Sequence, residues 1–424
     1  MKSATLHNLL PANARATRDG LVVGGITAAD LVDRYGSPLV VYDEQELRSR
    51  CAAVCAAFPD GASYAAKAFL CGSIARLVHE EGLGLDVASN GELAVARAAG
   101  VPAAALTLHG NNKSREELDS ALRAEVGRTV VDSLDEVHRL EALAAACSSP
   151  PRVAVRVNPD VTAATHRSIR TGQADSKFGA ALGFGDAEAI IHRLRSSPLV
   201  SFCGLHVHIG SQITDLDALG RAIRRTAALA SRVEAAELIV GGGLGVAYRV
   251  GDVVPDIPAW GAIAHRAARQ AGFAGRILAE PGRAVSATAG ITLYTIGTVK
   301  SASSTTFLAV DGGLSENPRP ALYQARYQPF LARCPQVDAR PGPYTVVGKN
   351  CEASDTFAGD VAIPGDPQVG DLLCVPVTGA YCYSMASNYN RLPRPAVVMV
   401  GDGHSYPILR RETIADLLRL DLVA

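Results

Sequence analysis

The chain has 424 residues, of which 48% are apolar, and its 41 basic and 42 acidic side chains leave a net charge of -1. Such a chain can bury a large core, and its balanced charge gives no global footprint for nucleic acid or an anionic membrane. The sequence has no apolar run long enough to span a bilayer, and its first twenty residues lack the apolar core of a signal peptide. Its nine cysteines form no CxxC pair, which implies neither a disulfide framework nor a structural zinc site. We therefore expect a cytoplasmic enzyme without a nucleic-acid or membrane partner.

From about residue 38, short apolar runs alternate with helix-like stretches. Residues 38–43 (PLVVYD) predict a strand, 44–58 a helix, and 72–82 a helix closed by Gly82. Further strand-like runs follow at 62–69, 83–89, 152–159, 202–211, 236–243 and 276–283. About eight strand–helix repeats predict a parallel α/β fold, and their spacing favours a closed (β/α)₈ barrel of the TIM type over residues 41–288.

The pattern changes after residue 288, where short β-type runs are separated by Gly and Pro turns. This pattern predicts a mostly antiparallel β domain over residues 289–424. Near the other end, LVVGGI (21–26) reads as a strand, and residues 26–36 read as a short helix closed by Gly36. We expect the segment 1–40 to pack with the C-terminal β domain.

Polar residues and a glycine stand where the predicted barrel strands end. They are Lys67, Asp86, His109, Asn158, His208, Gly241 and Glu280. Because barrel active sites lie at the carboxyl ends of the strands, we expect the chemistry there.

Lys67 is one of only six lysines and lies between alanines in the apolar run SYAAKAF. An apolar strand end would desolvate its amine, lower the pKa and free the amine to attack an aldehyde as a Schiff base. The alternative is an edge-strand lysine whose ammonium reaches water.

His206 and His208 alternate in GLHVHIGSQI, which places them on the same side of a strand. Two such histidines can bind a metal, but a third ligand is missing at any obvious spacing, so we expect no metal. The other use of a histidine ring is to stack on a flat cofactor. The small residues Gly210 and Ser211 suit an anion-binding turn.

Two further motifs suit phosphate and charge recognition. The glycine loop 239–248 (IVGGGLGVAY) lets backbone N–H groups approach a phosphate, although it can equally be a tight turn. Glu280 needs a partner at a strand end, and a protonated pyridine nitrogen would be one. Arg283 can bind a phosphate or a carboxylate through its fork. The alternative is that Glu280 and Arg283 pair with each other.

The C-terminal region carries candidate substrate contacts. Arg319 and Tyr323 lie four residues apart and can together hold a carboxylate. Cys351 can donate a proton and Glu352 can hold an amine, although a cysteine is more often a buried apolar residue. Tyr381 lies in a loop with three tyrosines, where it can donate to a phosphate or a substrate or simply pack.

The joint order of these motifs is more specific than any one of them. The motifs are YAAKAF, LDVASNGEL, HGNNKS, VDSLDE, RVNP, THRSIRTGQADSKFG, GLHVHIGSQI, GGGLG, EPGR, DGGLSENPRPALY, GKNCEASDTF and GAYCYSMASNYN. Over about residues 20–424 the sequence resembles the diaminopimelate decarboxylases, a family of barrel-type (fold type III) pyridoxal-phosphate enzymes.

The resemblance implies decarboxylation of meso-2,6-diaminopimelate to L-lysine, the last step of lysine biosynthesis, with pyridoxal 5'-phosphate as cofactor. It implies that Lys67 binds the cofactor covalently, His208 stacks on its ring, Glu280 pairs with the ring nitrogen and Cys351 donates a proton after decarboxylation. The implied cofactor-binding residues are Lys67, Asp86, His208, Ser211, Gly242, Gly243, Glu280, Gly282, Arg283 and Tyr381. The implied substrate-binding residues are Arg283, Arg319, Tyr323, Glu352 and Tyr381. In the family the Cys–Glu turn acts across a dimer interface, which implies a homodimer with shared sites.

Two departures from the family pattern keep alternatives open. Pro318 precedes Arg319 in SENPRP and restricts the local backbone, and Ala353 stands where the family usually has serine. The substrate can therefore also be a related amino acid, such as ornithine, arginine, lysine or one tethered to a carrier protein. The Cys–Glu turn argues against an amino-acid racemase, and the 136 residues after position 288 argue against a non-catalytic cofactor-binding barrel.

Overall fold

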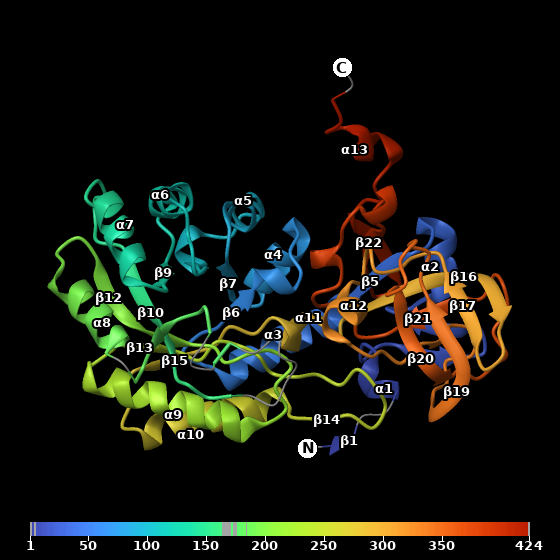
Figure 1. Ribbon diagram of the computed structural model, residues 1–424, viewed down its shortest axis with the longest axis horizontal. Helices are drawn as coiled ribbons and strands as arrows, with labels where there is room; N and C mark the ends of the chain where they lie inside the picture. Colours follow the sequence, from blue (N-terminus) through green and yellow to red (C-terminus); the bar gives the residue numbers. More distant parts are fainter. Residues whose placement is uncertain (1, 4–5, 163–170, 173–175, 184, 423–424) are drawn as a thin grey trace. The chain divides into compact units, whose positions relative to one another are not determined.

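A computed structural model describes residues 2–3, 6–162, 171–172, 176–183 and 185–422 (Figure 1). The chain forms two compact units. The barrel unit comprises Arg50–Gly245 and Pro255–Ala284, and the β unit comprises Met1–Ser49, Val246–Val254 and Val285–Ala424. No helix among the described residues is long and apolar enough to cross a membrane.

The barrel unit confirms the predicted TIM-type architecture. Within the described residues, eight parallel strands follow one another around the barrel: β6 (Ser63–Ala65), β7 (Gly84–Val87), β8 (Leu106–Leu108), β9 (Arg128–Val131), β10 (Arg152–Asn158), β12 (Ser201–Val207), β13 (Glu237–Ile239) and β15 (Arg276–Leu278). A parallel bridge between Ala62 and Ala279 joins the first strand to the last. The short strand β11 (Ala180–Ala181) pairs with β10.

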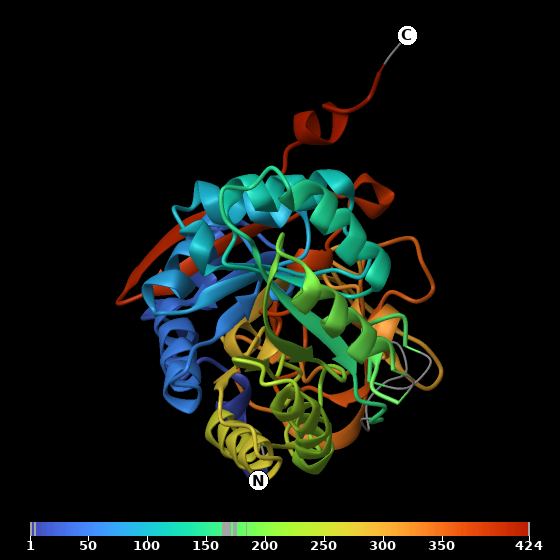
Figure 2. The same ribbon diagram turned by 90° about the vertical axis from the view of Figure 1, so that its left-hand side faces the viewer.

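Helices surround these strands (Figure 2). They are α3 (Glu44–Ala57), α4 (Gly72–Glu80), α5 (Asn90–Ala98), α6 (Arg115–Ala124), α7 (Leu134–Ala144), α8 (Asp186–Ser196), α9 (Leu216–Arg232), α10 (Ile257–Gln270) and α11 (Arg283–Ser286). Serine N-caps begin α5, α6 and α7. The predicted closure of α4 by Gly82 is seen in its φ of 90°, which glycine adopts without strain.

The barrel strands are apolar because both of their faces are covered. One layer of the interior consists of a single residue from each of five strands: Val130, Ala154, Cys203, Ile239 and Leu278. Side chains therefore fill the barrel, and the chemistry is confined to the strand ends.

At the amino ends of the strands, one buried carboxylate holds three arginines. Glu237 accepts hydrogen bonds from Arg128 Nη2 at 2.7 Å, Arg152 Nη2 at 2.6 Å and Arg276 Nη1 at 3.1 Å. Glu237 is buried, and the arginines come from three other strands. This cluster ties the strands of the barrel together at the end opposite the candidate site.

We expect Glu237→Gln to lower the free energy of unfolding by about 3–5 kcal/mol, because it leaves the neighbouring cations without their counter-charge. Urea denaturation should show a lower midpoint with an unchanged slope. Glu188→Gln is the matched control, because Glu188 pairs with Arg232 at 3.0 Å on the surface, and such pairs contribute about 0–1 kcal/mol. Equal effects of the two substitutions would contradict the structural role of Glu237.

The β unit confirms the mostly antiparallel domain. Its main sheet has the order β20 (Thr356–Ala362), β19 (Asp338–Val347), β17 (Thr306–Val310), β16 (Gly290–Ser301), β5 (Leu39–Asp43), β22 (Ala396–Gly401) and β23 (His404–Leu409). The strand β21 (Leu372–Val375) pairs with β16 and with β18 (Phe330–Leu331). Two of these pairings, β5–β22 and β17–β19, are parallel.

The other elements of this unit are short. They are β1 (Lys2–Ser3), α1 (Leu6–Leu9), β2 (Arg15–Thr17), β3 (Gly20–Val23), β4 (Ile26–Thr27), α2 (Ala28–Tyr35), β14 (Val253–Val254), α12 (Arg319–Tyr323) and α13 (Ile414–Leu418). The expected strand at 21–26 and helix at 26–36 are thus present as β3 and α2, and Gly36 closes α2. Leu21, Val23 and Leu31 share one core with Ile291 and Val398 of the β sheet.

The strand predicted at 38–43 is formed, but its assignment to the barrel alternation is wrong. As β5 it pairs antiparallel with β16 and parallel with β22. All five of its residues are buried, so its apolar run looks the same as that of a barrel strand. The helix α3 that follows it begins at the predicted position.

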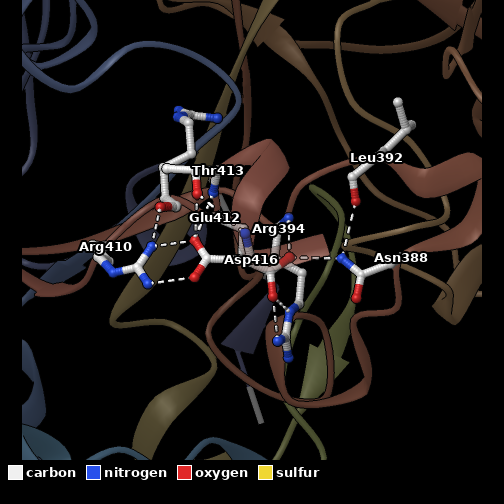
Figure 3. A network of polar contacts seen from close by, with 8 residues as sticks. Asn388, Leu392, Arg394, Arg410, Glu412, Thr413 and Asp416 are labelled. Carbon is white, nitrogen blue, oxygen red and sulfur yellow. Dashed lines mark hydrogen bonds and ion pairs between the residues drawn. The ribbon is translucent and has the colours of Figure 1, made fainter. Parts of the chain in front are cut away.

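The C-terminal segment is fixed to this unit by charged side chains (Figure 3). Glu412 accepts from Arg394 Nε at 2.8 Å and from Asn388 Nδ2 at 2.6 Å. Asp416 accepts from both ends of the Arg410 guanidinium and completes a capping box with Thr413 at the start of α13. Through Asn388, these contacts also anchor the loop that carries Tyr381.

Candidate active site

Lys67 lies in the 3₁₀ turn Ala66–Ala68 directly after β6. Ala66 and Ala68 are buried, but Lys67 itself is exposed. The prediction that its apolar neighbours desolvate the amine is therefore wrong. In a 3₁₀ turn consecutive side chains point about 120° apart, so buried neighbours in the sequence do not surround the residue between them.

Charged groups of other strand ends lie near Lys67. Its positive charge acts on Asp86 of β7, on Glu92 and on His208. Burial raises the pKa of Asp86, and the charges of His109 and Lys67 oppose this rise. Of the predicted strand-end residues, Asp86 and His208 thus lie near Lys67.

Glu280, which follows β15, is bound by two histidines. His109 Nε2 lies 2.9 Å from Oε1, and His206 Nε2 lies 3.0 Å from Oε2. Burial alone would raise the pKa of Glu280, but the two histidines lower it well below its ordinary range. Arg283, the alternative partner, donates from Nη2 to Ser211 Oγ at 2.9 Å. Glu280 is therefore ionised and keeps lone pairs for a further donor.

His208 and the glycine loop lie next to each other. The amide of Gly242 donates to His208 Nδ1 at 3.3 Å, which puts the ring proton on Nε2. Burial lowers the pKa of His208 well below its ordinary value, as does the nearby charge of Lys67. His208 is thus a neutral, flat ring at neutral pH.

The glycine loop leaves no room for side chains. A Cβ at Gly242 would lie 2.3 Å from the carbonyl oxygen of Glu280, and a Cβ at Gly243 would lie 2.3 Å from that of Gly210. Gly243 also has a φ of 97°, which favours glycine. With Ser211 and Arg283 beside it, the loop offers N–H, hydroxyl and guanidinium donors to an anion.

These groups fit pyridoxal phosphate. An amine lies near a neutral imidazole, an ionised and buried carboxylate stands at another strand end of the same barrel, and a glycine loop with an arginine can take the phosphate. Among the described residues, His109, His206 and Glu280 are also the one set whose ligand atoms could hold a metal, since these atoms lie within 4.8 Å of one another. The metal pair considered from the sequence, His206 with His208, is not the pair that forms this set.

Sequence reasoning missed several members of this cluster. The charges of Asp132, Glu280 and Asp86 act on Arg156 of β10, whose guanidinium lies 4.4 Å from the ring centre of Phe178. Its signal was the motif RVNP at a strand end. The partnership of His109 with Glu280 had no local signal, because the two residues are 171 positions apart.

In the β unit, Arg319 lies at the start of α12 and is buried, with 4% exposed. Its Nη1 donates to Tyr327 Oη at 2.5 Å, and its guanidinium lies 4.4 Å from the ring centre of Tyr248. Tyr323 lies four residues along the same helix and is half-buried. The predicted helical pair is thus formed, and two further tyrosines hold the arginine.

The Cys–Glu turn lies on the surface of the β unit. Cys351 and Glu352 are both exposed. The Cys351 amide donates to Asn390 Oδ1 at 2.8 Å, and Tyr389 Oη donates to Glu352 Oε2 at 3.3 Å. The alternative that Cys351 is a buried apolar residue is therefore wrong.

Tyr381 has a φ of 59°, a left-handed conformation that is uncommon for tyrosine. Such strain persists where the surrounding structure imposes it, often at functional sites.

Of the motif 165–179, residues 165–170 and 173–175 lie outside the described residues.

Two buried carboxyl groups lie beside the Arg319 loop, and one of them, Asp355, connects this loop to the Cys–Glu turn. Glu316 accepts from the Gly313 amide at 2.5 Å and from Ser315 Oγ at 2.8 Å. Asp355 accepts from the amides of Leu314 at 2.8 Å and Asn350 at 3.0 Å. Burial raises the pKa of Glu316 to about 7 and that of Asp355 to about 6.

We expect this pair to make the β unit less stable as the pH rises from 5 to 8. Between the unfolded and folded pKa values the folded chain keeps protons that the unfolded chain has released, so stability falls with pH. Urea midpoints measured across this range should fall less steeply in Glu316→Gln than in the wild type. Asp19→Asn, an exposed substitution in the same unit, should leave the slope unchanged. Parallel slopes in wild type and Glu316→Gln would contradict the raised pKa.

Comparison with known proteins agrees with this site. Residues 44–287 match the family model described as pyridoxal-dependent decarboxylase, pyridoxal binding domain. The diaminopimelate decarboxylase of Actinosynnema pretiosum subsp. auranticum is 44% identical over 422 residues, which cover 98% of this chain and 95% of the relative. That of Bacillus subtilis is 40% identical, with 95% of each chain covered. The crystal structure of the diaminopimelate decarboxylase of M. jannaschii in complex with L-lysine superposes with a TM-score of 0.91 at 29% identity, covering 98% of each chain.

The barrel, its strand-end cluster and the matching family model define the chain as a pyridoxal-dependent decarboxylase, with pyridoxal 5'-phosphate as its cofactor. The level of identity over nearly the whole chain is more specific. The chain belongs to the diaminopimelate decarboxylase family.

Proposed function

We propose that this chain removes carbon dioxide from meso-2,6-diaminopimelate and yields L-lysine, the last step of lysine biosynthesis. The observation that carries the proposal is the 44% identity, over 98% of the chain, to a diaminopimelate decarboxylase. The L-lysine bound to the related M. jannaschii enzyme supports it, because L-lysine is the product of this reaction.

The residues of the barrel unit are proposed to bind the cofactor and to hold the proton on its ring. Bound pyridoxal phosphate supplies an electron sink for the pair left when carbon dioxide departs. Lys67 would hold its aldehyde carbon through the exposed amine, whose charge acts on Asp86. Glu280 would accept a hydrogen bond from the protonated ring nitrogen, and His208 would pack against the ring. The loop residues hold the phosphate: Ser211, Gly242, Gly243, Gly282 and Arg283.

In the β unit the proposed roles concern the substrate. Arg319 and Tyr323 bind the distal carboxylate, and Glu352 binds the distal ammonium group. Recognition at that end fixes the rotation of the scissile bond, which is positional catalysis. Tyr381 contacts the substrate and closes over the phosphate, and Arg283, which belongs to the barrel unit, also contacts the substrate. Cys351 returns a proton to the α-carbon.

We further propose a cytoplasmic homodimer whose sites are shared across the interface. The exposure of Cys351 and Glu352 on a single β unit supports this, because a turn that is open in one copy can enter the site of another. The proposed segments are 1–40, the cofactor-binding segment 41–288 and the C-terminal domain 289–424.

The reaction is tested by incubating the cofactor-loaded protein with meso-diaminopimelate and measuring carbon dioxide and the chirality of the amino acid formed. We expect equal amounts of gas and L-lysine. Gas from lysine, ornithine or arginine but not from diaminopimelate would contradict the proposed substrate and make Pro318 the first residue to replace.

Shared sites predict complementation between two inactive variants. Lys67→Ala and Cys351→Ala, unfolded together and refolded as a mixture, should form hybrid dimers that hold one intact site. Random pairing would restore about a quarter of the wild-type sites. Each variant treated alone is the control. A mixture that stays as inactive as its components would contradict a shared site.

A further inference from the structure

The carboxylate of Glu280 receives a hydrogen bond on each of its two oxygens. His109, which follows β8, lies 2.9 Å from Oε1, and His206 of β12 lies 3.0 Å from Oε2. All three side chains are buried, with exposed fractions of 7%, 2% and 5% in the order His109, His206, Glu280. The contacts join residues from three strands of the barrel, so they depend on the tertiary fold and not on a local turn.

The single ring N–H of neutral His206 donates to Glu280. Burial lowers the pKa of His206 to about 4, against the opposing effect of Glu280, so its ring is neutral at neutral pH. An ionised carboxylate only accepts, so the single N–H must be at Nε2. His206 Nδ1 is buried, and it has no hydrogen-bond partner among the described residues.

His109 has a second acidic neighbour. Its Nε2 lies 3.7 Å from Asp86 Oδ1, which is too far for a hydrogen bond but close enough for an electrostatic interaction. The other charged or titratable groups that act on Glu280 are Asp86, Arg156 and His208. Of all these groups, His109 and His206 are the ones that touch the carboxylate, so they determine its orientation.

We propose that His109 and His206 are positioning residues, which hold the Glu280 carboxylate in one orientation and thereby keep the ring nitrogen of pyridoxal phosphate protonated. Two donors on different oxygens stop the carboxylate from rotating, and the remaining lone pairs can face one further N–H. The inference rests on the proposed role of Glu280, and it assigns to the histidines no contact with the cofactor or the substrate.

The test replaces each histidine in two ways and examines the reconstituted holoenzyme. Glutamine keeps an N–H donor of similar reach, whereas leucine removes it. The variants are His109→Gln, His109→Leu, His206→Gln and His206→Leu. Reconstitution with pyridoxal phosphate labelled with ¹⁵N in the ring allows NMR to follow the protonation of that nitrogen against pH. Cofactor affinity is measured by equilibrium dialysis.

We expect the pH at which the ring nitrogen loses its proton to fall by about one unit or more in the leucine variants. Without its donors the buried Glu280 carboxylate can rotate, and burial raises its pKa, so less negative charge faces the ring nitrogen. Decarboxylation should slow by about 10- to 100-fold, the usual effect of removing a group that orients a ligand. The glutamine variants should recover most of both losses. His265→Leu, a half-buried histidine bound to the Ala57 carbonyl, is the matched control and should change neither.

Three results would overturn the proposal. One is a ring nitrogen that titrates as in the wild type in both leucine variants. The second is a glutamine variant as impaired as its leucine counterpart, since that outcome indicates packing and not donation. The third is stoichiometric zinc binding by the cofactor-free protein that excludes pyridoxal phosphate, which would make the three residues a metal site. The ring titration is measured without turnover, so a failure of the proposed substrate leaves this result readable.

Discussion

Replacing Lys67 with alanine is expected to reduce decarboxylation by more than about 10⁴-fold, because the chain then lacks the amine that binds the cofactor covalently. Lys67 is exposed at a strand end of the barrel, and its charge acts on Asp86 and His208. The amine therefore lies near other strand-end residues and is open to an aldehyde.

Attachment can be measured apart from turnover. Borohydride treatment of the loaded protein followed by mass spectrometry should show one cofactor bound per wild-type chain, mapped to the peptide that contains residue 67. The variant should show none. Lys300→Ala is the control, since Lys300 is exposed in β16 of the other unit. An undiminished adduct in Lys67→Ala would transfer the role to another lysine.

The barrel could be predicted because each strand–helix repeat leaves its own local signal. The helices α3 and α4 begin and end close to the predicted residues, and Gly82 closes α4 as expected. The error at β5 has a physical origin. A strand buried on both faces is apolar whichever sheet it joins, and its parallel partner β22 lies more than 350 residues away.

Some features of the candidate site could likewise be predicted from the sequence, and others could not. Lys67, His208 and Glu280 could be found because parallel strands bring their carboxyl ends together. The exposure of Lys67 could not, since it depends on a single 3₁₀ turn. The bonds from His109 and His206 to Glu280 depend on the closure of the barrel, which brings non-neighbouring strands face to face.

In the β unit, the helical spacing of Arg319 and Tyr323 was visible in the sequence, but the environment of the arginine was not. Tyr327 follows eight residues later, whereas Tyr248 comes from a segment that follows the glycine loop of the barrel. Both aromatic rings pack against the guanidinium and restrict its movement. Arg319 is therefore held rigidly, as a residue that recognises a fixed carboxylate should be.

Arg319→Met is expected to lower kcat/KM for meso-diaminopimelate by about 10²- to 10³-fold, because removing one partner of a buried charge pair costs about 2–5 kcal/mol. Arg319→Lys should restore little of this, since an ammonium lacks the planar fork that binds both oxygens of a carboxylate. Cofactor attachment to Lys67 should be unchanged in both variants. Arg326→Met, an exposed arginine seven residues on, is the matched control.

Comparison with the product shows whether this loss is specific to the distal carboxylate. L-lysine lacks that carboxylate, so Arg319→Met should bind L-lysine, measured as an inhibitor that competes with diaminopimelate, about as tightly as the wild type does. The preference for diaminopimelate should therefore fall by nearly the full 10²- to 10³-fold, as expected for a site that discriminates by a buried polar partner. An equal loss of L-lysine binding and of kcat/KM would show that Arg319 supports the β unit as a whole, and the distal carboxylate would then need another cation.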